Sequence, residues 1–375
     1  MYPRIYLAAD NCVFYKRWTD PDEWARKFKE LGIEYIEASA DTELDPLYMG
    51  PAYLYAWVQK VKEAEIMHGV KVCNLYSGHG TYTTLGLTHS DARVRRHMVE
   101  NWFFPMIRIA GELNCGMGFF THAVKHEVLQ SEELYNQYVD ILVDILVELN
   151  QYAAIVGCES LSIELMYTPH QYPWRQKDVR ELLKRVTQKS GRDFYFTDDV
   201  GHHHVKFQRA TKEQFMESNG TNLWLGTDLA YELARRFGKD AWSQITEEMD
   251  KVPHLFATRE DGDCYDMLRK FGCYSPIIHL QQTNGAQSIH LPFTEAENSK
   301  GIITPEKVLQ ALKESYDMPY EEGMPEKCQE IYLTLEIFSQ TTSIMNQVLN
   351  DYAESVHYWR RYIPQDGLPL DQLLQ

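Results

Sequence analysis

The segment DFYFTDDVGHHH, residues 193–204, contains a short apolar run that ends in two adjacent acidic residues and three consecutive histidines. Similar apolar runs recur along the chain, and longer segments with helical spacing separate them. The runs lie at residues 4–9, 33–39, 71–77, 117–122, around Leu161, 193–199, 276–282 and 331–338. Segment 193–204 therefore contains the sixth strand of a strand–helix alternation that covers most of the chain.

The segments between these runs are predicted helices. The first, residues 21–32, begins with Pro21 and ends with Gly32, as helix termini prefer. Eight strands, each followed by a helix, predict an α/β fold, a (β/α)8 TIM barrel, with a doubly wound sheet as the alternative. We expect residues 1–340 to form the barrel. Residues 341–375 are predicted to form a final helix and a loose tail, packed on the barrel or on a partner subunit.

Two connections are longer than the others. One extends from about residue 203 to residue 272, and the second, at 285–304, contains the sequence SIHLPF with His290. In a barrel they follow the sixth and seventh strands, on the face where loops build active sites. We expect these loops to cover the site, with His290 as a candidate lid contact.

Composition and charge restrict the partners of this chain. The net charge of −17 disfavours nucleic acid and anionic membranes, which need a positive surface, but it allows a neutral sugar. No apolar stretch is long enough for a signal peptide or a membrane span. The seven cysteines include no CxxC pair. We therefore expect a reduced, cytoplasmic protein, and a homo-oligomer is compatible with the aromatic final helix.

Four titratable residues interrupt predicted strands near their carboxyl ends, namely Glu164, Asp199, His279 and Glu336. An isolated buried carboxylate is very costly, but the carboxyl ends of barrel strands converge on one rim. Three carboxylates and one imidazole suit a divalent metal, Mn²⁺ best, with Co²⁺, Mg²⁺ or Zn²⁺ as alternatives. Taken singly, each residue also fits a plainer role as an edge carboxylate or a hydrogen-bonded core histidine.

The sequence from Asp199 to His202, DVGH, resembles the DxxH element of the xylose isomerase-like superfamily of sugar isomerases and epimerases, which includes the ketose 3-epimerases. The resemblance implies a TIM barrel that binds one divalent metal through Glu164, Asp199, His279 and Glu336. It also implies that His202 contacts the substrate. The chain departs from the ketose 3-epimerases at Gly285, because they have an arginine six residues after the metal-binding histidine.

The substrate contacts of the missing arginine would then come from Gln281, Gln282 or Asn284. His79 and His122 end the third and fourth strands, so both are further candidates for orienting a sugar hydroxyl. Lys206 and Arg209 follow the histidine run, but the chain has no glycine-rich phosphate loop, and solvated charges are the simpler interpretation. Similarly, Asp198, His203 and His204 are expected to be hydrogen-bonded loop residues without a ligand role.

The expected reaction moves a proton next to a carbonyl through a cis-enediolate, either in aldose–ketose isomerisation or in ketose 3-epimerisation. A metal would polarise the carbonyl, while Glu164 and Glu336 would be the acid/base pair. One alternative is a metal-dependent lyase or decarboxylase that acts on a sugar acid. Others are an endonuclease-IV-like hydrolase, which the net charge disfavours, and a sugar-binding protein without catalysis.

Overall fold

The computed structural model describes residues 2–77, 84–218, 220 and 222–374. Its eight parallel strands close into a barrel, because β1 pairs with both β2 and β8. The strands follow one another around the barrel in sequence order, which confirms the predicted (β/α)8 fold. They are β1 (Arg4–Asp10), β2 (Tyr35–Ser39), β3 (Lys71–Tyr76), β4 (Gly116–Phe119), β5 (Leu161–Glu164), β6 (Tyr195–Asp199), β7 (Ile277–Leu280) and β8 (Glu330–Leu335).

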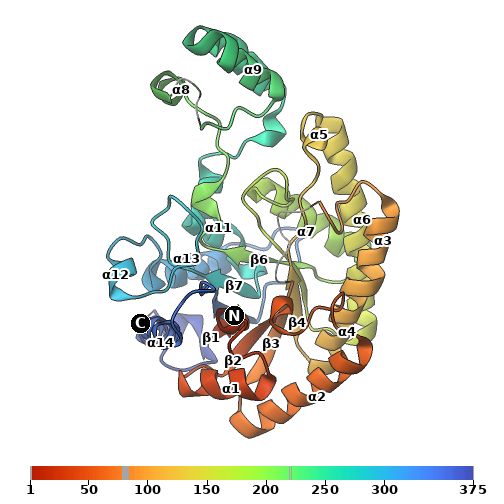
Figure 1. Cartoon of the computed structure of the whole chain (residues 1–375), viewed down its shortest axis with the longest axis vertical. Helices are drawn as coiled ribbons and strands as arrows, with labels where there is room; N and C mark the ends of the chain where they lie inside the picture. Colours follow the sequence, from red (N-terminus) through yellow and green to blue (C-terminus); the bar gives the residue numbers. More distant parts are fainter. Residues whose placement is uncertain (1, 78–83, 219, 221, 375) are drawn as a thin grey trace.

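Helices surround the barrel (Figure 1). None of the helices in the described part of the chain is long and apolar enough to cross a membrane. They are α1 (Pro21–Glu30), α2 (Pro51–His68), α3 (Ala92–Met98), α4 (Phe104–Leu113), α5 (His126–Leu129), α6 (Glu132–Val156), α7 (Gln176–Ser190), α8 (Lys212–Ser218), α9 (Asp228–Phe237), α10 (Trp242–Asp250), α11 (Cys264–Phe271), α12 (Glu295–Asn298), α13 (Pro305–Asp317) and α14 (Met345–Arg360).

The interior of the barrel is unusually polar towards its carboxyl end. Alternate strand positions face inward. At the amino end these positions carry the stacked rings of Tyr6 and Tyr332, with centroids 4.8 Å apart. Further along, buried Asn74, Ser162 and Thr197 replace apolar side chains. Buried polar groups need hydrogen-bond partners. These side chains can therefore supply hydrogen bonds to charged residues at the carboxyl end of the barrel.

The two long connections lie where the sequence predicted them, after β6 and β7. The first contains α8 and α9, which stand away from the barrel in Figure 1. The second is tied to the rim, because Gln282 N donates to Leu291 O at 2.8 Å and Phe338 N donates to His290 O at 3.2 Å. These hydrogen bonds hold the part of the loop that contains His290 over the ends of β7 and β8.

The C-terminal residues pack on the barrel that precedes them. Helix α14 buries Tyr352, whose hydroxyl donates to Leu335 O at 3.1 Å. The chain then forms β9 (Leu368–Pro369), which pairs antiparallel with β1. The prediction of a loose tail was wrong, because the tail pairs with β1 and buries Leu370 completely.

Candidate active site

Four buried side chains from four consecutive strands meet at the carboxyl end of the barrel. Glu164 ends β5, Asp199 ends β6, His279 lies in β7 and Glu336 directly follows β8. Each offers one ligand atom, and the four atoms lie within 4.8 Å of one another. None of the four side chains belongs to a residue more than 5% exposed. The structure therefore brings together the residues that the sequence proposed as one ligand set.

The charges in this cluster are closely coupled. His279 Nδ1 lies 3.2 Å from Glu336 Oε2 and 3.5 Å from Glu164 Oε1. Burial alone would lower the pKa of His279, but Glu336 and Glu37 raise it well above its usual value. Burial would likewise raise the pKa of Glu336, yet His279 and His290 hold it well below its usual range.

The donor set fits a divalent cation. The buried atoms His279 Nδ1 and Glu336 Oε2 lie 3.2 Å apart, but within the described residues neither makes a hydrogen bond of acceptable geometry. Buried polar atoms are normally satisfied, and unsatisfied ones that converge with two further carboxylates can be satisfied by a metal. Oxygen-rich ligands with one imidazole are typical of ions such as Mn²⁺ rather than of structural zinc sites, which favour thiolates.

Glu37 on β2 accepts a hydrogen bond from the cluster residue His279, and the sequence analysis missed it. His279 Nε2 donates to Glu37 Oε1 at 2.6 Å, while Asn74 Nδ2 donates to Glu37 Oε2 at 2.6 Å. A carboxylate on one ring nitrogen fixes the histidine tautomer, so Nδ1 is left as the potential ligand. The signal was present in the sequence IEYIEAS, where a fully buried glutamate interrupts an apolar strand.

The Asp199 carboxylate accepts hydrogen bonds from one side-chain amide and one backbone amide. Gln281 Nε2 lies 2.9 Å from Oδ1 and 2.8 Å from Oδ2, and Gly201 N donates to Oδ1 at 2.7 Å. A Cβ atom at Gly201 would lie 2.3 Å from the Gln281 side chain, so this approach requires glycine. Burial raises the pKa of Asp199, although His202 and His290 partly oppose that effect.

The model of the xylose isomerase-like TIM barrel family matches residues 25–336, which include the whole cluster. The chain belongs to the xylose isomerase-like TIM barrel family. It is 25% identical over 370 residues to D-erythrulose 1-phosphate 3-epimerase of Brucella abortus (strain 2308), covering 96% of each chain.

Solved structures show the same fold at lower identity. A crystal structure named as a candidate xylose isomerase of Rhodospirillum rubrum has a TM-score of 0.65 and 17% identity, covering 95% of this chain and 99% of that one. The D-allulose 3-epimerase of Methylomonas sp., solved with D-allulose, has a TM-score of 0.54 and 12% identity, covering 97% and 98%. The erythrulose phosphate and allulose relatives are thus named as sugar epimerases, which are isomerases.

In this xylose isomerase-like barrel, His202 lies next to the cluster. Its Nε2 lies 3.3 Å from Asp199 Oδ2, and its Nδ1 lies 3.1 Å from Leu165 O and 3.7 Å from Glu164 Oε1. The ring packs against Tyr167 at a centroid distance of 4.8 Å. His202 therefore lies beside both Asp199 and Glu164, and one backbone carbonyl and one aromatic ring position it there.

His290 lies over the Glu336 side, and its ring is 6.3 Å from that of His202. Its Nδ1 is 3.3 Å from Glu336 Oε2, and its ring stacks on Phe338 at 3.8 Å. Burial alone would lower the pKa of His290, but Glu336 and Asp199 raise it to about 9. The sequence suggested His290 only as a candidate lid contact in a long loop. The backbone hydrogen bond from Phe338 N, shortly after β8, to His290 O brings it to the site.

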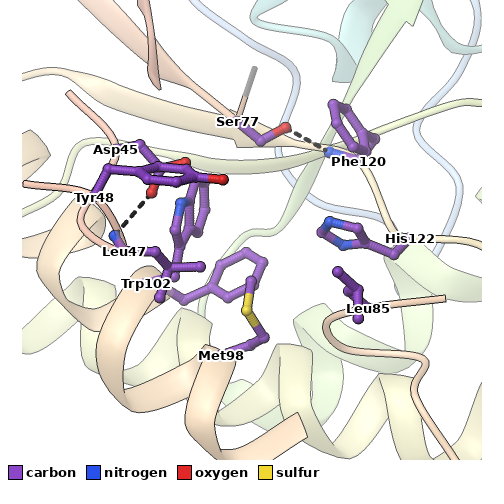
Figure 2. A pocket seen from close by; sticks show the side chains of 10 residues that line it. Asp45, Leu47, Tyr48, Ser77, Leu85, Met98, Trp102, Phe120 and His122 are labelled. Carbon is purple, nitrogen blue, oxygen red and sulfur yellow. Dashed lines mark hydrogen bonds between the residues drawn. The ribbon is translucent and has the colours of Figure 1, made fainter. Parts of the chain in front are cut away.

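The other predicted substrate contacts, His122, Gln282 and His79, do not lie among the described residues of the cluster. His122 lines a pocket beside the ends of β3 and β4 (Figure 2). Gln282 is 1% exposed, and its amide donates to Asn298 Oδ1 and Ile303 O, so it holds the loop after β7. His79 lies outside the described residues.

Asp198 and His203 form a buried pair on the outer side of β6. His203 Nε2 lies 2.8 Å from Asp198 Oδ1, and Lys206 Nζ lies 3.1 Å from His203 Nδ1. Burial lowers the pKa of Lys206 to about 8. The expectation of a solvated Lys206 was wrong, because the side chain is buried and contacts His203. Arg209 is exposed, as expected, and pairs with Asp250.

Proposed function

We propose that this chain is a divalent-metal-dependent sugar isomerase or epimerase that moves a proton next to a carbonyl group. The observation that carries the proposal is the buried cluster of Glu164, Asp199, His279 and Glu336, which lies at the carboxyl rim of a barrel. Active sites of TIM barrels lie at that rim. The substrate class is supported by the homologues, whose names describe sugar epimerases.

The four cluster residues would hold the metal, with Mn²⁺ as the best match to their chemistry and Co²⁺, Mg²⁺ or Zn²⁺ as alternatives. A bound divalent ion supplies Lewis acidity, which polarises a substrate carbonyl and stabilises negative charge on oxygen. Glu37 would keep the Nδ1 lone pair of His279 directed at the ion, because its carboxylate accepts a hydrogen bond from the Nε2–H group.

Glu164 and Glu336 would transfer the proton. They come from β5 and from the end of β8, and Glu336 is kept ionised by His279 and His290, as a base must be. One carboxylate removes the proton from the carbon next to the carbonyl. In an epimerase the other returns a proton to the opposite face, whereas in an aldose–ketose isomerase the proton is returned to the neighbouring carbon.

His202 and His290 would bind the substrate oxygen atoms. Both imidazoles lie beside the cluster, one near Glu164 and the other near Glu336. A protonated imidazole donates charge-assisted hydrogen bonds, so His290 would stabilise the developing enediolate oxygen and fix the carbon skeleton between the two carboxylates.

Two measurements test this proposal. Elemental analysis of the purified protein should find about one divalent ion per chain. The metal-loaded protein should then be screened with ketoses and aldoses in heavy water, and deuterium should enter the product at one carbon. A product that lost carbon dioxide or water would instead establish a lyase. Absence of exchange from every sugar, in a protein that binds the metal, would contradict the proposed function.

A further inference from the structure

A separate pocket lies beside the ends of β3 and β4, where Ser77 and Phe120 line it (Figure 2). Its volume is about 280 Å³, and its walls include Met98, Trp102 and Phe120. Trp102 and Phe120 are each only 4% exposed, so they belong to the packed interior. A concave, largely apolar surface of this size is typical of a site for part of a small molecule.

One layer of side chains separates this pocket from Glu164. Tyr76 donates its hydroxyl hydrogen bond to Glu164 Oε2, and its ring lies 6.2 Å from that of Phe120. Phe120 therefore contributes to the pocket wall and also packs against the residue that contacts the candidate acid/base group. The pocket wall is thus linked to Glu164 through the contact between Tyr76 and Phe120.

The polar groups in the pocket make a phosphate an unsuitable occupant. Asp45, which is 8% exposed, contributes a carboxylate, and His122 contributes an imidazole, while no lysine or arginine is among the described residues that line the pocket. A phosphate needs positive partners, and a carboxylate next to it would be repulsive.

The mouth of the pocket is more apolar than a free surface usually is. Leu85 is 57% exposed and Tyr48 is 75% exposed, while both line the opening. Burial of such surface beneath a ligand contributes favourably to binding, in proportion to the area removed from water. The combination of apolar walls, an apolar mouth and a carboxylate therefore favours an uncharged ring or alkyl group.

We propose that this pocket is a subsite for an uncharged, apolar substituent carried by the sugar, such as an alkyl or aryl ether or glycoside group, rather than for a phosphate ester. The proposal rests on the proposed function and makes it more specific. It separates this chain from its erythrulose phosphate epimerase relative, whose name specifies a phosphorylated substrate.

The test has two independent parts. First, saturation-transfer NMR should detect benzyl alcohol bound to the metal-loaded protein. Second, the ketose that exchanges fastest in heavy water should be compared with its benzyl ethers and its phosphate esters. We expect one benzyl ether to have a kcat/KM at least about tenfold above that of the parent ketose, because an aromatic ring leaves water. The phosphate esters should be poorer substrates than the parent.

Leu85→Trp should fill the pocket mouth and remove both the benzyl alcohol signal and the advantage of the ether. Exchange with the parent ketose should stay within about twofold, and Leu134→Trp, at a 42% exposed leucine on α6, is the matched control. Circular dichroism checks that both variants fold. Absence of benzyl alcohol binding, or preference for a phosphate ester, would overturn the proposal. If no ketose exchanges, the proposed function fails, while specific benzyl alcohol binding would still support the pocket.

Discussion

The Nε2 atom of His279 donates a hydrogen bond to Glu37 Oε1 over 2.6 Å, and this bond joins the seventh strand of the barrel to the second. Glu37 has no direct place in the four-residue cluster, yet it determines which nitrogen of His279 faces the carboxylates. Because Asn74 holds the other oxygen of Glu37, the whole arrangement has little freedom to rotate. The geometry of the site thus depends on Glu37 and Asn74 behind His279, and not on the four cluster residues alone.

Glu37→Gln should weaken metal binding while leaving the barrel folded. The amide has the same shape but lacks the charge that stabilises the His279 N–H, and loss of such a partner typically costs about 10- to 100-fold in metal affinity. Competition with a fluorescent chelator measures the effect. Glu34→Gln, at an exposed position just before the same strand, should leave the affinity unchanged. Equal affinities for both variants would show that Glu37 does not act through His279.

Glu164→Gln and Glu336→Gln should each reduce turnover by about 10²- to 10⁴-fold, because each removes one proton-transfer group. In a two-base epimerase the two variants should differ in which epimer still exchanges. Each variant should exchange deuterium only into the epimer whose proton its remaining carboxylate removes, without forming the other epimer. Mass spectrometry of the recovered sugars distinguishes the two cases. Glu159→Gln, at an exposed residue before β5, is the control and should retain wild-type exchange.

His290→Asn should lower kcat/KM by about 10- to 100-fold, since a charge-assisted hydrogen bond to the reacting oxygen would be lost. Metal affinity should change far less, because His290 is not in the ligand set proposed here. Steady-state kinetics and metal titration on the same preparation separate these effects. The exposed His97→Asn variant controls for the loss of an imidazole elsewhere. Unchanged kinetics in His290→Asn would remove His290 from the mechanism.

Lys206 should make the stability of the protein depend on pH between about 8 and 10.5. Its pKa is about 8 in the folded chain against an ordinary value of 10.5, so the unfolded chain binds more protons in this range. Stability of the wild type should therefore rise with pH relative to Lys206→Met, by about 3 kcal/mol in total. Urea unfolding at several pH values measures the difference. The exposed Lys212→Met variant should instead follow the wild type.

Several features of the site could be predicted from residues far apart in the sequence. Glu164, Asp199, His279 and Glu336 each interrupt an apolar strand, and parallel strands in a barrel must end at one rim. Glu37 also interrupts an apolar strand, but it lies in the first half of the chain, far from the DxxH element that begins at Asp199. His290 gave no such signal, because its position depends on hydrogen bonds between a long loop and the residues that follow β7 and β8.

The alternation of apolar runs and amphipathic segments determined the barrel, since period and length are local properties that each segment carries by itself. The same alternation determined which acidic residues would be buried at strand ends. Only the tertiary structure decided which residues complete the site. Gln281, Glu37 and His290 reach it through contacts between distant segments, while Gln282 and Lys206 turn to other partners. The direction of a side chain beyond a strand end depends on long-range packing and hydrogen bonding, which no local pattern encodes.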